Sequence, residues 1–171
     1  MRAARSDSRC NGQVGAAGAS AGASHAAFLA ADGTAFDDKV EVAVCLSGAY
    51  DFSDPLSLST SYGFKNKVEN YCFVGTPPPE PTYSATLLAD SPVSKVTSSV
   101  SPMMLVQSDN ESMPPQQMPD LAAKLNSVGA VNYQSILVAG TRHGWPNWAP
   151  LKDQELAFIA AALASNPPPT P

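Results

Sequence analysis

A short motif built on glycine and serine constrains the fold of this chain more than any other part of its sequence. Residues 18–22 have the pattern G-x-S-x-G, with Ser20 at the centre. The small and apolar run Gln13–Gly18 before it predicts a buried strand, and the alanine-rich segment Ala21–Ala31 after it predicts a helix. A serine placed in this way lies on a tight turn, where small neighbours avoid a clash and the hydroxyl projects from the carboxyl end of the strand. The simpler alternative is that Ser20 only caps the helix.

Predicted strands and helices alternate along the rest of the chain. Three more strands are expected at Val40–Leu46, Pro102–Val106 and Val131–Val138, and two more helices at Pro115–Val128 and about Pro150–Ser165. This alternation is typical of βαβ units, which build a mainly parallel sheet with helices on both faces. The sequence therefore predicts an α/β fold with about four strands.

Two parts of the chain carry more detailed expectations. The last helix is expected to bury one apolar face, made of Leu156, Ile159, Ala160 and Leu163. Residues 51–101 are punctuated by Gly63, Gly75 and three consecutive prolines at 77–79, and are expected to be an irregular insertion. Short helical candidates in it are Lys65–Tyr71 and Tyr83–Ala89.

Composition and charge limit the kinds of partner. With 171 residues, of which 44% are hydrophobic, one domain is expected over residues 1–165, followed by a proline-rich tail at 166–171. A net charge of −5 and no cluster of basic residues exclude nucleic acid as an expected partner. No apolar run approaches the ~20 residues of a membrane span, and no signal peptide is visible after Met1.

The cysteines give no sign of a metal site. Cys10, Cys45 and Cys72 are widely spaced and form no C-x-x-C pair, so neither zinc nor a redox motif is expected. Cys45 lies in an apolar run and is expected to be buried, while a disulfide between Cys10 and Cys72 stays open. Because the sequence also lacks a phosphate-binding loop and a dinucleotide fingerprint, no cofactor is expected.

Two polar loops follow the third and fourth predicted strands. His143, in the segment Arg-His-Gly-Trp, could serve as a general base for Ser20, and the preceding loop supplies Asp109 and Glu111 as acids to orient it. The carboxyl ends of parallel strands share one edge of a sheet, so these residues are expected near Ser20. His25 lies only five residues after Ser20 in the same predicted helix and is expected to be a packing residue.

Together these segments resemble α/β-hydrolases of the esterase, lipase and prolyl-oligopeptidase-like kind. Residues 18–23 resemble the G-x-S-A-G-G elbow of that family, and residues 46–51 resemble its S-G-x-Y-D segment. Residues 90–93 are similar to its A-S-P element, and residues 140–144 to its G-x-x-H loop. The resemblance implies a serine hydrolase that cleaves small-molecule carboxylic esters through an acyl-enzyme.

The same resemblance implies roles for individual residues. Ser20 takes the position of the nucleophile and His143 that of the base, while the Ala21 N–H at the helix start can stabilise an oxyanion. The family's acid loop, G-x-x-D-x-x-V-P, aligned on Pro115, places Glu111 at the acid position and Asp109 two residues early. Glu111 is therefore the preferred acid, with Asp109 as the alternative.

The resemblance covers only the C-terminal portion of the family fold. Family members carry several strands before the elbow and an H-G-G-type loop that supplies oxyanion donors, whereas 19 residues precede Ser20 here. The strand Gln13–Gly18 would then be an exposed edge, and self-association is expected. The second functional hypothesis is accordingly a catalytically impaired remnant or an interaction module.

Overall fold

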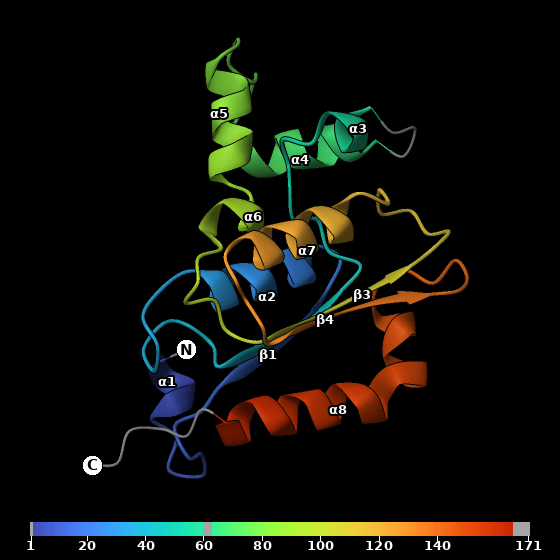
Figure 1. The fold of residues 1–171 in the computed structure, drawn as a ribbon. Helices are drawn as coiled ribbons and strands as arrows, with labels where there is room; N and C mark the ends of the chain where they lie inside the picture. The colour runs from blue at the N-terminus through green and yellow to red at the C-terminus, as the bar shows by residue number, and fades with distance from the viewer. Residues whose placement is uncertain (1, 60–62, 166–171) are drawn as a thin grey trace.

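A parallel β-sheet forms the centre of the structure, a computed structural model that describes residues 2–59 and 63–165 (Figure 1). Within these residues the sheet has four strands in the order β1-β2-β3-β4, and all neighbours are parallel. Their bounds are β1 Gly15–Ala19, β2 Val42–Leu46, β3 Met103–Ser108 and β4 Tyr133–Val138. The predicted α/β fold with about four parallel strands is confirmed.

Helices cover both faces of this sheet (Figure 1). On one face lie α2 (Ala21–Ala31) and α7 (Gln117–Ser127), and on the other lies α8 (Trp148–Ser165). In β2, alternate residues serve the two faces: Cys45 packs with α2 and α7, whereas Val44 packs on the α8 side. Because both faces are covered, β2 and β3 are buried along their whole length, which explains why β2 and the first four residues of β3 are all apolar.

An ion pair closes the amino end of the sheet. Arg5, at the end of α1 (Arg2–Arg5), contacts Glu41 at 2.8 Å between Nη1 and Oε2, with 8% and 1% of the two side chains exposed. The same Glu41 oxygen accepts a hydrogen bond from the Val14 N–H at 2.7 Å, and Arg5 donates to the Gly12 carbonyl. These bonds tie the N-terminal helix to the starts of β1 and β2.

The segment 51–101 is more regular than the sequence suggested. It contains four helices within its described residues, and α4 and α5 match the two helical candidates. Two local features explain why α3 begins where it does. Pro55 lies in its first turn, and the Asp54 carboxylate caps the helix by accepting from the Leu56 and Ser57 amides. The bounds are α3 Pro55–Leu58, α4 Phe64–Cys72, α5 Thr82–Ala89 and α6 Pro92–Lys95. Figure 1 shows α3, α4 and α5 above α2 and α7, on the side of these helices that faces away from the sheet.

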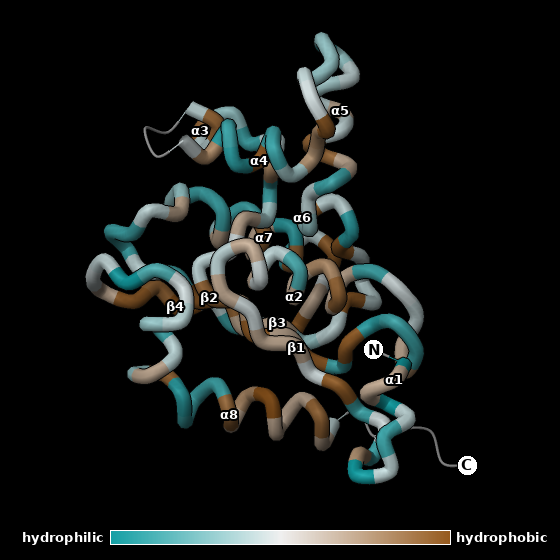
Figure 2. The backbone as a smooth tube through the Cα atoms, turned by 180° about the vertical axis from the view of Figure 1, so that it is seen from behind, coloured by the Kyte–Doolittle hydropathy of each residue, from teal (hydrophilic) through white to brown (hydrophobic). Residues whose placement is uncertain are grey.

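The expected buried face of α8 is wrong in part. Leu156 is 45% exposed and Ala160 is also exposed, whereas Glu155 is completely buried. The side chains of α8 that pack against the sheet begin with Trp148 and Leu151. Residues three or four positions apart share one face of a helix, so Glu155 lies on this same face. In Figure 2, α8 alternates between hydrophilic and hydrophobic colours along its length, so hydropathy alone did not identify this row.

The remaining sequence expectations concern cysteines, membranes and the tail. All three cysteines are free thiols; Cys45 is buried as expected, and Cys10 and Cys72 form no disulfide. No helix among the described residues is long and apolar enough to cross a membrane. The proposed tail, residues 166–171, lies outside the described residues.

Glu155 should make the stability of the fold depend on pH. Its two carboxylate oxygens are buried without hydrogen-bond partners, and burial raises the pKa of Glu155 to about 7. Between pH 4.5 and 7 the unfolded chain releases this proton more readily than the folded chain, so stability falls as the pH rises. Glu155→Gln should remove up to about 3 kcal/mol of this pH-dependent loss in the free energy of unfolding. Urea unfolding at several pH values between 4.5 and 7 measures it. Asp153→Asn, on the exposed side of α8, is the control, and a parallel pH curve for Glu155→Gln and the wild type would contradict the prediction.

The β1 edge generates a second prediction. No strand pairs with the outer side of β1 within the described residues, and β1 contains neither a charged residue nor proline. We propose that a second copy of the chain covers this edge, so that light scattering at micromolar concentration shows a dimer or larger species. Ala17→Lys, which places a charge on an exposed position of β1, should shift the population toward monomer. A monodisperse 17.8 kDa wild-type monomer would contradict the proposal.

Candidate active site

Ser20 lies on a strained turn between β1 and α2. Its backbone φ is 54° and ψ is −122°, a conformation that L-residues rarely adopt. The Ser20 N–H donates to the Leu46 carbonyl at 2.8 Å, which ties the turn to the end of β2. Its side chain makes no capping hydrogen bond to the helix, so capping does not explain this serine. Strain of this kind persists where the surrounding structure enforces it, and it is frequent at functional sites.

Gly18 makes the turn sterically feasible. A Cβ atom added to Gly18 would lie 2.0 Å from the Gly22 carbonyl oxygen, so no larger residue fits there. A Cβ added to Gly22 would meet nothing within 4 Å. The expectation that both glycines avoid a clash therefore holds for Gly18 and not for Gly22.

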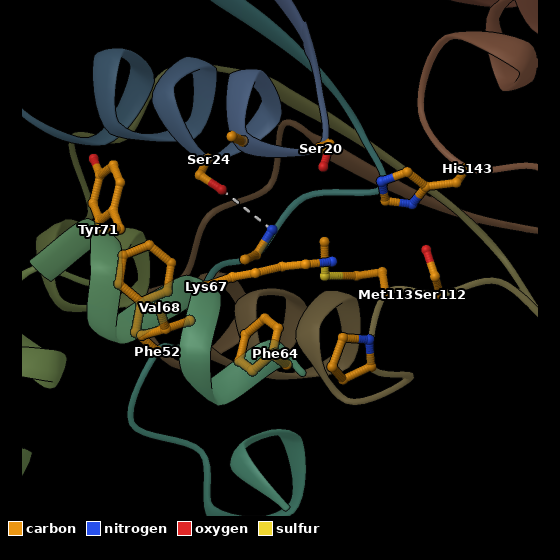
Figure 3. Close-up of a pocket in the computed structure, with 13 residues that line it drawn as sticks. Ser20, Ser24, Phe52, Phe64, Lys67, Val68, Tyr71, Ser112, Met113 and His143 are labelled. Atoms are coloured by element: carbon orange, nitrogen blue, oxygen red, sulfur yellow. Dashed lines mark hydrogen bonds between the residues drawn. The ribbon is translucent and has the colours of Figure 1, made fainter. Parts of the chain in front are cut away.

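The Ser20 hydroxyl and the His143 ring face each other across a pocket (Figure 3). His143 lies in the loop between β4 and the short 3-10 helix η1 (Trp145–Asn147). Ala21, the first residue of α2, lines the same pocket. The first amides of a helix have no intrahelical partner and carry a partial positive charge, so the Ala21 N–H is suited to bind an oxyanion.

Glu111 lies on the other side of His143. Its Oε2 is 2.5 Å from Nδ1 of His143, and the Glu111 side chain is completely buried. Its other oxygen accepts from the Ser47 hydroxyl and the Ser108 N–H, both at 2.8 Å. With Nδ1 directed to this carboxylate, Nε2 of His143 is the nitrogen available to Ser20.

Asp109 has a different position. Its carboxylate accepts from the Gly140 N–H at 2.9 Å, at the base of the loop that carries His143, and it is exposed. The structure thus pairs Glu111 with His143, places Ser20 and His143 in the lining of one pocket, and leaves Asp109 outside this arrangement. His25 is exposed, and its ring is tilted by 52° against the Tyr71 ring, with the ring centroids 5.7 Å apart.

Sequence reasoning missed two residues that support this arrangement. Ser47 has a left-handed φ of 55° and, besides donating to Glu111, accepts from the Gly144 N–H at 2.9 Å. The buried Asn147 accepts from the Ser108 hydroxyl at 3.1 Å and donates to the Arg142 carbonyl at 3.0 Å. Ser47 belongs to a motif that the sequence singled out, but its contacts join residues about 100 positions apart.

The pocket beside Ser20 has a volume of about 150 Å³ and mainly apolar walls. Phe52 and Tyr71 meet edge to face with ring centroids 5.5 Å apart, and desolvation raises the pKa of Tyr71. Buried Gln117 holds the loop before Phe52 by accepting from the amides of Tyr50 and Asp51. The other lining residues are Ser24, Ala49, Phe64, Lys67, Val68, Ser112, Met113 and Pro114.

Metal ligation has no support in the described part of the chain. No group of three histidine, cysteine, aspartate or glutamate side chains there is arranged to hold an ion. The polar side chains gathered here are instead the Ser20 hydroxyl, the His143 imidazole and the Glu111 carboxylate.

Comparison with known proteins identifies the fold. No protein-family model matches the sequence, and no curated protein sequence matches it significantly. A truncated form of a carbohydrate esterase from gut microbiota superposes with a TM-score of 0.68 at 18% identity, over 94% of this chain and 65% of the other. A puromycin-hydrolysing peptidase of Mycobacterium tuberculosis gives 0.70 at 19% identity, over 90% of this chain and 22% of the other.

The chain has a partial α/β-hydrolase fold. A further similar structure, the acetyl ester-xyloside bifunctional hydrolase from Caldicellulosiruptor lactoaceticus, has a TM-score of 0.62 at 18% identity and covers 96% of this chain and 62% of the other. This chain spans less than two thirds of each of these three structures. In the α/β-hydrolase fold the strand–turn–helix around Ser20 is the position of the nucleophile elbow, and the turn geometry of Ser20 agrees with it.

Proposed function

We propose that the protein is a serine hydrolase that cleaves carboxylic esters. The observation that carries this proposal is that Ser20, on its strained turn, lines the same pocket as His143, whose Nδ1 contacts buried Glu111. Similar structures include an esterase aligned over 94% of this chain and a peptidase aligned over 90% of it, which supports a hydrolase in general, and the ester is our choice of substrate class.

Acylation would begin at the Ser20 hydroxyl. Its oxygen forms a bond to the carbonyl carbon of the ester, and its proton moves to Nε2 of His143. The carbonyl electrons move onto oxygen, and the Ala21 N–H donates to this oxyanion. When the tetrahedral intermediate collapses, the bond to the alcohol oxygen breaks and His143 returns the proton to the departing alcohol.

Deacylation would reverse the roles with water as the nucleophile. Water attacks the acyl carbon and gives its proton to His143, and the bond between the acyl group and Ser20 breaks as that proton returns to the Ser20 oxygen. The carboxylic acid leaves, and the starting state is restored. Throughout, Glu111 keeps the ring orientation and stabilises the imidazolium, while remaining ionised itself.

The second candidate is a non-catalytic module that retains the same side chains. It is favoured by one observation, that the chain spans only 65% and 22% of the lengths of two similar hydrolase structures. The two candidates differ in turnover: an enzyme hydrolyses a short-chain 4-nitrophenyl ester in a manner that depends on Ser20, and a module does not.

Ser20 should react with a fluorophosphonate probe, because such probes report a serine activated by a neighbouring base. Mass spectrometry of the labelled protein should find the adduct on Ser20, and Ser20→Ala should lower kcat for 4-nitrophenyl butyrate by about 10³-fold or more. Ser98→Ala, at an exposed position outside the pocket beside Ser20, is the control. Labelling that persists in Ser20→Ala would show that another residue is the nucleophile.

Glu111 and Asp109 should differ sharply in their effect on the same reaction. Glu111→Gln removes the charge that orients His143 and should lower kcat by about 10²–10⁴-fold, whereas Asp109→Asn should change it by less than about tenfold. Thermal unfolding of both variants separates lost activity from lost structure. The assignment is wrong if Asp109→Asn is the more damaging of the two.

A further inference from the structure

Lys67 is the one permanently charged side chain that lines the pocket beside Ser20. It projects from α4, a helix in the segment between β2 and β3, and Figure 3 shows its long stem lying across the pocket toward Met113. The walls beside the stem include Phe64 and Val68, so its methylene groups cover apolar surface while the ammonium group remains at the opening.

The ammonium group of Lys67 has no acidic partner among the described residues. Lys65, two residues earlier on α4, shows the contrast: its Nζ lies 3.7 Å from the Glu69 carboxylate and it is absent from the pocket lining. Asp109, the exposed acid of the neighbouring loop, is bonded to the Gly140 N–H. An unpaired cation in an otherwise neutral pocket attracts an anionic group of a ligand.

The pocket also indicates which part of an ester would meet this cation. His143 must protonate the departing alcohol, so the alcohol part lies on the His143 side of Ser20. Figure 3 shows Phe52, Val68 and Tyr71 on the opposite side of Ser20 from His143, which leaves this apolar region for the acyl part. Lys67 belongs to the same helix as Val68 and Tyr71, and its stem runs from that region toward Met113.

We propose that Lys67 selects esters whose acyl part combines an apolar body with a carboxylate group. The apolar body packs against the aromatic walls, and the carboxylate pairs with the Lys67 ammonium at the pocket opening. This inference rests on the proposed ester hydrolysis for its reaction and deepens it by naming a substrate class. Because Lys67 is exposed, the pairing is screened by salt and contributes a modest preference.

A matched pair of substrates tests this selection. The 4-nitrophenyl monoester of adipic acid and 4-nitrophenyl hexanoate share a six-carbon acyl chain and differ in whether it ends in a carboxylate. Lys67→Met keeps the apolar stem and removes the charge, so the adipate-to-hexanoate ratio of kcat/KM should fall about fivefold at low salt. Lys67→Glu should lower the ratio further, and Lys65→Met should leave it unchanged. The wild-type ratio should also fall toward the Lys67→Met value as salt is raised.

Binding to Ser20→Ala separates this inference from the proposed function. This variant should hold both intact esters, and equilibrium dissociation constants should show the same preference for the adipate monoester and its loss in Ser20→Ala combined with Lys67→Met. A ratio that Lys67→Met leaves unchanged, or an equal loss for both esters, would overturn the selection by Lys67. If neither ester is hydrolysed but the binding preference follows Lys67, the proposed function is wrong and the anion-selective pocket stands.

Discussion

The buried carboxylate of Glu111 holds together the three loops that follow β2, β3 and β4. It accepts from Ser47 after β2 and from the Ser108 N–H at the end of β3, and it contacts His143 after β4. An ionised carboxylate with no exposed surface is stable only when such partners replace water. The position of His143, the proposed base, therefore depends on hydrogen bonds that connect the carboxyl ends of β2, β3 and β4.

Glu155 is a second buried carboxylate, but its surroundings differ from those of Glu111. Both carboxylates are buried, but neither oxygen of Glu155 has a hydrogen-bond partner among the described residues, and burial raises the pKa of Glu155 to about 7. The difference lies in the surroundings: Glu111 lies where backbone and hydroxyl donors converge, whereas Glu155 faces the apolar side of the sheet. Keeping this carboxyl group buried therefore lowers the free energy of unfolding when the group is ionised.

Much of the architecture followed from local patterns. The bounds of α2 agree with the sequence prediction at both ends, and each predicted strand exists within a few residues of its expected bounds. These elements were predictable because β2 and the first four residues of β3 are apolar and because the alanine-rich segment after Ser20 has a strong helical preference. The less accurate predictions, the irregular segment 51–101 and the buried face of α8, concern regions where turn chemistry and packing outweigh hydropathy.

The sequence by itself determined the order of the strands and helices, the tight turn around Ser20 and the loops that carry Glu111 and His143, because these depend on neighbouring residues. Only the tertiary structure decided which carboxylate contacts His143, that Ser47 and Asn147 brace the loops, and that Lys67 enters the pocket. The contacts of His143 with Glu111 and of Gly144 with Ser47 join residues 32 and 97 positions apart. They arise when a parallel sheet brings the ends of its strands to one edge, and no local preference encodes which side chains meet there.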